Sequence, residues 1–411
     1  MNPQTQQSRL VLEAEATREY GTTVLKAARH RHFASRDVTA TALADELGRR
    51  PEVEVLALLD EEGRPAGILT REGLFSLLGK PFGREVLGRT RAWELAESAP
   101  RMDCHASLFA AGTGKAAADS PYRVLVDAEG RFRAILSSRD LAEHLSRITE
   151  EDIDLAGRIQ ERLEAGNEAL SNRLYGFEAW SRPAKGVGGD FWYSKRLEDG
   201  RAFFALCDVS GKGVAASLVV SLVWGMLRMF DFRRGLYALL RSLNEALVAT
   251  FHLEKYLTGF FGVYDPRTGV LEAADMGHAH ALVFREGRAR RLDPGHRNLP
   301  VGVEPNLEPV LRRWRLRDGD ALFVYSDGIP EQEDAEGGEL GERRLAILVQ
   351  KALRGGRALR DALPGALDLH RGTAPQQDDM SFILLTRPEG LRSPMPRAEE
   401  PDTRVFLRPE A

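Results

Sequence analysis

The chain has 411 residues, 43% of them hydrophobic and 29% charged, and its formal net charge is −4. A single hydrophobic core stops growing at about 250–300 residues, so at least two domains are expected. The composition is that of an ordinary soluble globular protein, and it lacks the basic excess of a nucleic-acid-binding protein.

Three features predict a cytoplasmic protein without a membrane span. The polar and charged residues 1–20 lack the apolar core of a signal peptide. No apolar run reaches the ~18 residues that a transmembrane helix needs. The two cysteines, Cys104 and Cys207, lack the spacing of a metal site, and a reducing compartment fits them better than a disulfide framework.

The first 35 residues are expected to form an N-terminal extension, with the first 20 mobile or weakly helical. Two histidines occur in the segment RHRHF, residues 29–33. A solvated basic face is the preferred interpretation of this segment, and a metal site is the alternative.

An internal repeat follows this extension, because residues 55–78 and 122–145 match at an offset of 67 positions. Each copy predicts a buried strand, a tight Asp-x-x-Gly turn, a returning strand and the start of a helix. The alternative is a pair of unrelated hairpins with similar turns.

The repeat resembles a tandem CBS-domain pair over residues 36–147, which implies a small α/β regulatory domain. Such pairs often bind adenine nucleotides in the cleft between the copies. The nearest matches to the acidic nucleotide contact of that family are Glu72 and Asp140. A purely structural or dimerising role is an equal alternative.

A linker or signalling helix is predicted over residues 148–173. Its apolar and small residues at a spacing of three to four form one stripe, made of Ala156, Ile159, Leu163, Gly166 and Leu170. The stripe either packs on a neighbouring domain or pairs two subunits. The second interpretation predicts a homodimer.

The second domain is expected over residues 174–388, followed by a disordered tail over residues 389–411. Strands are predicted in the segments FFALCDVSG, GFFGVYDPRTGVLEAADMGH, ALVFREGRARRL, DALFVYSDG and MSFILLTR. Helices are predicted in LVVSLVWGMLRMF, RGLYALLRSLNEALVATF and ERRLAILVQKALRGG. Two long central helices and many hairpin-spaced strands predict sheets covered by helices.

Four short motifs of this domain place aspartates at strand ends or turns, most of them beside glycines. The aspartates are Asp190, Asp208, Asp327, Asp378 and Asp379. Clustered carboxylates without histidine or thiolate are hard ligands that suit Mg²⁺ or Mn²⁺, and anions share a site only when a cation offsets their repulsion. Each motif alone is usually a turn or a surface feature, so the prediction depends on their conjunction.

The set GGDFW, DVSGKG, YSDGIPE and DDMSFILL, together with the FFGVYDPRTG–GH stretch, resembles the SpoIIE/RsbU-like branch of PPM-type protein phosphatases. The resemblance covers about residues 174–387, and AGRIQERL upstream is similar to the first helix of that branch. It implies an α+β fold, an α-β-β-α sandwich with two central antiparallel sheets flanked by helices.

The resemblance also implies a two-metal centre of Mn²⁺ or Mg²⁺. Asp190 and Asp208 would bind the ions, with Asp208 bridging both and the backbone carbonyl of Val209 completing one coordination sphere. Asp327 and Asp378 would hold the other ion. Asp379 would be auxiliary, because many relatives carry asparagine there. The bridging water would attack phosphorus in line, without a covalent phosphoenzyme.

Other residues near these motifs are candidates for binding the phosphate or substrate. Lys185, Lys212 and, more weakly, Arg182 supply positive charge, and His278 is either a proton donor or a turn histidine. The branch usually shows Asn-Ala-Gly-His where this chain has Asp-Met-Gly-His. Cys207 lacks the Cys-x5-Arg pattern of a phosphate loop and is interpreted as core packing.

The predicted function is a metal-dependent phosphoserine/phosphothreonine protein phosphatase regulated by its N-terminal domain. By resemblance, its substrate is a phosphorylated STAS-type anti-sigma-factor antagonist in a bacterial partner-switching pathway. The alternative is a non-catalytic pseudophosphatase that acts as a nucleotide-sensing scaffold.

Overall fold

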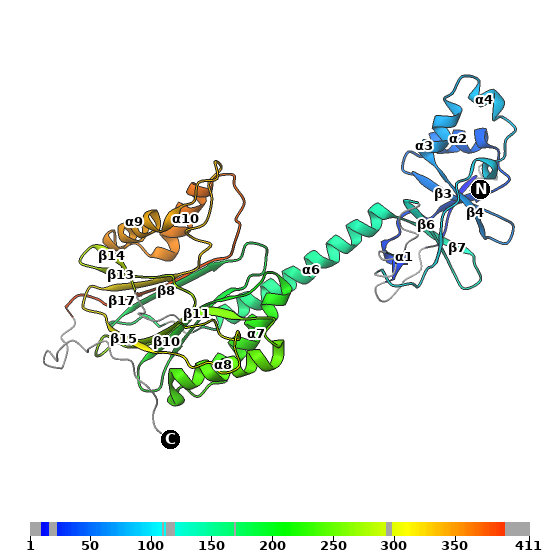
Figure 1. Ribbon diagram of the computed structural model, residues 1–411. Helices are drawn as coiled ribbons and strands as arrows, with labels where there is room; N and C mark the ends of the chain where they lie inside the picture. Colours follow the sequence, from blue (N-terminus) through cyan, green and yellow to red (C-terminus); the bar gives the residue numbers. More distant parts are fainter. Residues whose placement is uncertain are drawn as a thin grey trace, which may run out of the picture. The chain divides into compact units, whose positions relative to one another are not determined.

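The computed structural model describes residues 10–15, 23–108, 111, 120–167, 170–292 and 298–390. The chain divides into two compact units, residues 1–150 and 151–411 (Figure 1). Helix α6 (Ser138–Ala165) contains the last residues of the first unit and the first residues of the second. The predicted linker helix is therefore the continuation of a helix that starts inside the repeat, and this helix ends at Ala165.

The first unit contains two small sheets in its described part. One has the order β1 (Val11–Glu13), β2 (His32–Ser35), β3 (Val55–Leu59) and β4 (Pro65–Thr70). The other has the order β5 (Arg101–Asp103), β6 (Tyr122–Val126) and β7 (Phe132–Ser137). The short helices are α1 (Val24–Ala27), α2 (Ala40–Gly48), α3 (Arg71–Leu78), α4 (Gly83–Val86) and the 3₁₀ helix η1 (Ala92–Leu95).

The 67-residue repeat is present in the structure as two copies of one topology. In each copy a parallel strand pair is followed by an antiparallel one: β2–β3–β4 in the first copy and β5–β6–β7 in the second. The register shifts at equivalent places, between Leu58 and Leu59 and between Leu125 and Val126. Gly63 and Gly130 close the two turns with φ angles of 78° and 77°, a conformation that favours glycine. The assignment of this unit to the CBS family stays a prediction.

One expectation for the N-terminal segment is wrong. Residues 11–13 form strand β1 rather than a weak helix, and they pair in antiparallel direction with β2. Val11 is fully buried in the core of this unit, so burial of an apolar side chain against the sheet explains the strand. Residues 1–9 and 16–22 of the predicted extension lie outside the described residues.

The second unit contains two antiparallel five-stranded sheets in the part that the structure describes. The first has the order β15 (Arg312–Arg315), β12 (Val270–Met276), β11 (Leu257–Asp265), β10 (Ala202–Val209) and β9 (Asp190–Arg196). The second has the order β14 (Arg288–Arg291), β13 (Ala281–Arg285), β16 (Ala321–Tyr325), β17 (Met380–Thr386) and β8 (Gly176–Arg182).

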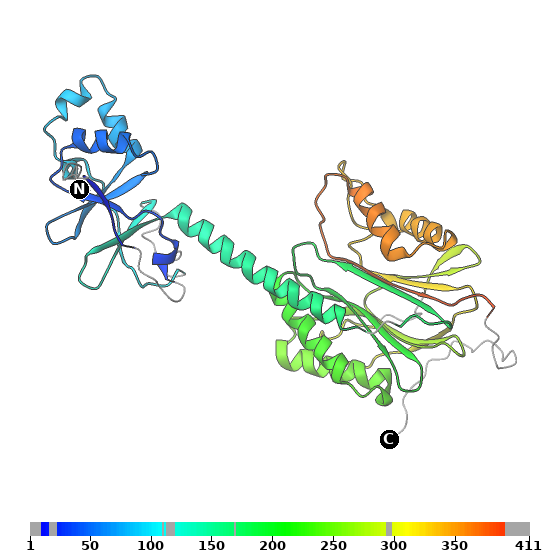
Figure 2. The same ribbon diagram turned by 180° about the vertical axis from the view of Figure 1, so that it is seen from behind.

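Helices cover the outer face of each sheet, as Figures 1 and 2 show. Helices α7 (Val214–Met229) and α8 (Gly235–Phe251), joined by the 3₁₀ helix η3 (Phe232–Arg234), pack on the first sheet. Helices α9 (Gly341–Arg354) and α10 (Leu359–Arg371) pack on the second. The predicted α-β-β-α sandwich with two central antiparallel sheets is confirmed.

Strand β10 shows why the central strands read as continuous apolar runs. Phe203 and Cys207 point into the core under α7 and α8, whereas Phe204 and Leu206 point into the core between the two sheets. Successive side chains of a strand face opposite sides, and both sides are buried here. Cys207 is therefore a core residue, as predicted.

The predicted strands and helices of this unit are all present, but α10 and the strands β8, β9 and β15 were not predicted as separate elements. Residues 391–411 of the predicted tail lie outside the described residues. Within the described residues, no single helix is long and apolar enough to cross a membrane. Helices α7 and α8 taken together have the required length and composition, but a bend of 83° separates them.

Candidate metal centre

Two aspartates meet across the antiparallel pair of β9 and β10. Asp190 is the first residue of β9, and its partner in the register is Asp208 of β10. Asp190 is buried, and the hydroxyl of Ser381 on β17 donates a hydrogen bond to its Oδ2 atom. Asp208 is half-buried. Directly opposed residues of antiparallel strands have neighbouring side chains, so β9 and β10 together supply one half of the site.

Two more aspartates lie at the facing edge of the second sheet. Asp327 follows β16, and Asp378 lies shortly before β17, the antiparallel neighbour of β16. The end of one antiparallel strand and the start of the next meet at the same edge of a sheet. The sandwich therefore supplies the other half of the site from its second sheet.

Asp379 connects the two halves of the site by hydrogen bonds. Its Oδ1 atom accepts a hydrogen bond from the backbone N–H of Ala184 at 2.7 Å, and its Oδ2 atom accepts one from Gly189, also at 2.7 Å. Both donors lie in the loop that leads into β9, and Asp379 is itself buried. The carboxylate thus orders the loop beside Asp190, a role that agrees with the auxiliary function expected of this residue.

Glycines allow the backbone to approach the carboxylates closely. A Cβ atom at Gly188 would overlap the carboxylate of Asp379. At Gly189 a Cβ atom would lie 2.7 Å from the carbonyl oxygen of Val209 and 3.3 Å from Oδ1 of Asp208. The missing side chain leaves a cradle lined by these two oxygens, which are two of the ligands that the family resemblance implies.

The negative charges of the site repel one another. Burial, and then the carboxylates of Asp327, Asp378 and Asp379, raise the pKa of Asp208 to about 7. Burial and the charge of Asp208 raise the pKa of Asp190 well above its ordinary value. The neighbouring carboxylates therefore disfavour ionisation of Asp190 and Asp208, and a divalent cation is what offsets such repulsion.

The donor set fits Mg²⁺ or Mn²⁺, because it consists of carboxylate oxygens with one accessible carbonyl. Among the described residues, the group that brings three potential ligand atoms within 4.8 Å of one another is Asp103, Cys104 and His105 of the first unit. These are three consecutive residues at the end of β5, unrelated to the aspartate site.

The two predicted lysines lie differently. The Nζ atom of Lys212 forms an ion pair with Oδ2 of Asp378 at 2.8 Å and donates a hydrogen bond to the carbonyl of Gln377 at 3.2 Å. Lys212 therefore belongs to the site. Lys185 is an exposed residue of the loop before β9, and it forms no ion pair with an aspartate in the described part of the chain.

His278 has the environment of a structural histidine. It is buried, and burial lowers the pKa of its imidazole to about 3. Its backbone N–H donates to Oδ1 of Asp275 at 2.7 Å, and Asp275 also accepts from the N–H of Ala279. Asp275 thus closes the turn with its side chain. A neutral buried ring is poorly suited to donate a proton at neutral pH.

Sequence reasoning missed Gln160 of α6 as a residue of the site. Its Nε2 atom donates a hydrogen bond to the carbonyl of Asp190 at 2.9 Å, and its Oε1 atom accepts one from the N–H of Gly188 at 3.2 Å. The side chain is buried. A polar residue on the apolar stripe next to Ile159 was the available signal, but only the fold shows which backbone groups it reaches.

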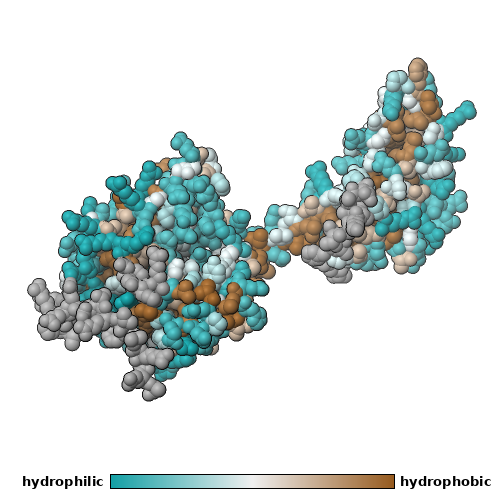
Figure 3. Space-filling model, in the orientation of Figure 1, coloured by the Kyte–Doolittle hydropathy of each residue, from teal (hydrophilic) through white to brown (hydrophobic). Residues whose placement is uncertain are grey.

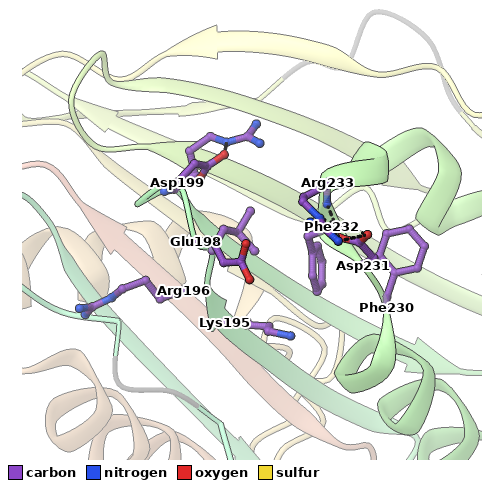
Figure 4. Close-up of a pocket in the computed structure, with 10 residues that line it drawn as sticks. Lys195, Arg196, Glu198, Asp199, Phe230, Asp231, Phe232 and Arg233 are labelled. Carbon is purple, nitrogen blue, oxygen red and sulfur yellow. Dashed lines mark hydrogen bonds and ion pairs between the residues drawn. The ribbon is translucent and has the colours of Figure 1, made fainter.

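A separate pocket of 350 Å³ lies at the opposite end of β9 from Asp190, between the β9–β10 hairpin and η3 (Figure 4). Its charged groups are largely paired with one another: Arg201 with Asp199 at 2.7 Å and Arg233 with Asp231 at 2.9 Å. This pocket is not part of the aspartate site.

Comparison with known proteins identifies this unit. The family model described as stage II sporulation protein E (SpoIIE) matches residues 198–388. Protein IcfG of Synechocystis sp. is 24% identical over 278 residues, which are 58% of this chain and 43% of that protein. The phosphoserine phosphatase RsbU of Bacillus subtilis is 23% identical over 201 residues, 49% of this chain and 59% of that protein. The chain spans about half the length of these curated relatives.

Solved structures of similar fold each cover more than half of this chain. The SiaA-PP2C domain of Pseudomonas aeruginosa is 19% identical with a TM-score of 0.49, covering 59% of this chain and 98% of that one. The PP2C phosphatase domain of SpoIIE from Bacillus subtilis, with a fragment of its regulatory domain, is 20% identical with a TM-score of 0.44, covering 53% and 64%. Residues 198–388 thus match the SpoIIE family model, and the C-terminal unit is similar to SpoIIE/RsbU-like domains of the PPM phosphatase type.

Proposed function

We propose that this chain is a metal-dependent protein-serine/threonine phosphatase. The observation that carries the proposal is the convergence of five aspartates from two sheets on one edge of a SpoIIE-type domain, with Asp190 opposite Asp208 and Asp379 ordering the loop that leads into β9. An acidic site of this kind is costly unless it binds cations, and the metal dependence of PPM phosphatases gives it a use.

Two divalent ions, Mn²⁺ or Mg²⁺, would be held by Asp190, Asp208, Asp327, Asp378 and the carbonyl of Val209, and would supply an activated water and offset the charge of the phosphoryl group. The chain's own residues position this chemistry. Asp379 and the glycines hold the loop before β9, and Ser381 orients the carboxylate of Asp190. Lys212, half-exposed beside Asp378, is placed to meet an anionic substrate.

The proposed substrate is a phosphoserine of a STAS-type anti-sigma-factor antagonist in a bacterial partner-switching pathway. The support is the likeness to the phosphoserine phosphatase RsbU. Regulation by the first unit is proposed to act through α6, because Gln160 of this helix binds the backbone on both sides of Gly189.

A homodimer that forms along α6 is part of the same proposal. Leu155 and Ile159, one helical turn apart on α6, are 51% and 46% exposed. Most of the surface that Figure 3 shows is hydrophilic, so exposed leucine and isoleucine side chains on one helical face favour contact with a partner helix.

The test is phosphate release by the purified full-length protein from a phosphoserine protein and from a small aryl phosphate, with Mn²⁺ or Mg²⁺. Asp208→Asn is expected to abolish release, and Asp199→Asn, an exposed aspartate at the far end of the β9–β10 hairpin, is expected to leave it unchanged. Full activity in Asp208→Asn would contradict the metal assignment. Absence of divalent-cation binding by calorimetry would instead support the pseudophosphatase.

A further inference from the structure

The first unit contains a cavity of 650 Å³ between the two copies of the repeat. It is lined by Glu54, Thr70, Arg71, Glu72, Phe75, Glu97, Pro121 and Tyr122. Two aromatic rings and three carboxylates dominate this lining. A cavity of this size is typical of a small-molecule site.

The carboxylates of the cavity form no ion pair among the described residues, and Glu54 acts on Arg139 through its charge alone. Glu54, Glu72 and Glu97 are exposed and take part in no ion pair there. The one cation of the lining, Arg71, donates its Nη1 hydrogens to the carbonyls of Leu47 at 2.7 Å and Arg50 at 3.0 Å. The guanidinium is therefore bound to the end of α2, and the cavity keeps a net negative charge.

The surroundings of Tyr122 show the same excess of negative charge. Burial raises the pKa of its phenol, and the carboxylates of Glu54, Glu97, Asp140 and Glu72 raise it further. These acidic groups thus act on one ring from different elements of the unit. A cation near that ring would interact favourably with all of them.

The internal repeat supplies a comparison within the molecule. In the first copy the N–H of Arg71 donates to the carbonyl of Glu54 at 2.7 Å, and in the second copy the N–H of Ser138 donates to Pro121 at 2.8 Å. Ile68 pairs with Glu97 in the first copy, and Ile135 pairs with His30 in the second. All of these pairs are related by 67 positions, so the same framework is built twice.

The two frameworks differ in charge at equivalent positions. In the second copy His30 lies 3.3 Å from Oδ2 of Asp140, and Arg29 lies 3.7 Å from its Oδ1 atom. In the first copy the equivalent of His30 is Glu97, and the equivalent of Asp140 is Gly73. The second framework therefore places Arg29 and His30 beside its carboxylate, whereas the first presents carboxylates around a cavity.

We propose that the cavity binds a small organic cation: a protonated amine on an apolar or aromatic body. The ammonium group of the ligand lies among the carboxylates of Glu54, Glu72 and Glu97. In the other copy, Arg29 and His30 lie beside the carboxylate of Asp140 in the same way. The rings of Phe75 and Tyr122 contact the body of the ligand. The rival is an adenine nucleotide, whose phosphates would lie among three carboxylates with the guanidinium of Arg71 already engaged.

Isothermal titration calorimetry on the full-length protein tests the proposal with three probes: 2-phenylethylamine, its neutral counterpart 2-phenylethanol, and AMP. The amine is expected to bind and the alcohol and AMP to bind at least tenfold more weakly. Affinity for the amine is expected to fall as salt is raised, since exposed charges are screened. The readout is binding alone, so the result does not depend on phosphatase activity.

Matched variants locate the site. Glu97→Gln is expected to weaken binding of the amine roughly two- to fivefold, as for an exposed ion pair, and the double variant Glu54→Gln, Glu97→Gln to weaken it further. Glu61→Gln, an exposed turn residue outside the cavity, should bind like the parent. Gly73→Asp combined with Glu97→His recreates the histidine–aspartate pair of the second copy and should weaken binding of the amine.

Three outcomes would overturn the proposal: no heat of binding with the amine at ~10 mM, a concentration that detects even very weak ligands; equal affinity for the amine and the alcohol; or tighter binding of AMP. Unchanged affinity in Glu97→Gln and in the double variant would also reject this cavity as the site.

Discussion

Gln160 on α6 holds the backbone of Asp190 at the start of β9. Its amide donates to the carbonyl of Asp190 at 2.9 Å and accepts the N–H of Gly188 at 3.2 Å. A helix that begins in the repeat thus ends in direct contact with the loop of the candidate metal centre. Any rotation of α6 about its axis would break both hydrogen bonds.

Replacing Gln160 is expected to impair the site without unfolding the domain. Gln160→Ala leaves two buried backbone groups without a partner, at a cost of about 1–3 kcal/mol each. We expect weaker Mn²⁺ binding by calorimetry and slower phosphate release. Glu161→Gln, on the exposed side of the same helix, is the control. If Gln160→Ala binds Mn²⁺ like the parent, the side chain has no part in ordering the loop.

Gly188→Ala is expected to damage the site sterically. Its new Cβ atom would overlap the Asp379 carboxylate that orders the loop, and a buried clash of this kind costs about 1–3 kcal/mol. Thermal unfolding should show the loss, and metal titration should show reduced affinity. Gly225→Ala in helix α7, where nothing lies within 4 Å of the new atom, should be neutral or slightly stabilising.

Lys212 and a metal ion compete for Asp378. Lys212→Met removes a positive charge that lies 2.8 Å from this carboxylate, so metal affinity should rise by a few-fold. The substitution also removes a positive charge that would attract an anionic substrate, so the KM should rise. The experiment therefore measures both quantities, with Lys212→Arg as the conservative control. If metal affinity and substrate affinity both rose or both fell in Lys212→Met, this role of Lys212 would be contradicted.

The stability of the second unit is expected to fall as the pH rises through the range in which Glu164 ionises. Burial raises the pKa of Glu164 to about 7 from its ordinary value of 4.5, although the hydroxyl of Ser181 donates to its carboxylate at 2.7 Å. Between these values the folded state binds more protons than the unfolded state, so the free energy of unfolding decreases as the pH increases.

Glu164→Gln removes this titration, so the fall in melting temperature between pH 5 and pH 8 should be smaller in the variant than in the parent. Glu151→Gln, an exposed residue of the same helix whose charge does not shift the pKa of Glu164, serves as the control. A pH dependence in Glu164→Gln that matches the parent would show that other groups dominate it.

Local patterns in the sequence were sufficient to predict many strands, helices and turns of both units. The apolar runs around Phe204 and Phe323 predicted strands, and both strands are buried on two faces. The Asp-x-x-Gly turns at Asp60 and Asp127 were predictable because their hydrogen bonds stay within five residues. Strand β1 was missed because a three-residue strand has too few residues for a periodic pattern, and its pairing with β2 depends on distant residues.

The sequence by itself determined the aspartates, their order and the 67-residue repeat, because motifs and internal matches depend only on neighbouring residues. The tertiary structure alone decided which groups meet: Asp190 opposite Asp208, Asp379 on the N–H of Gly189, Gln160 on the same loop, and His30 beside Asp140. It also decided that His278 is buried and neutral. Burial and charge depend on side chains that are brought together from distant parts of the chain, and no local pattern contains that information.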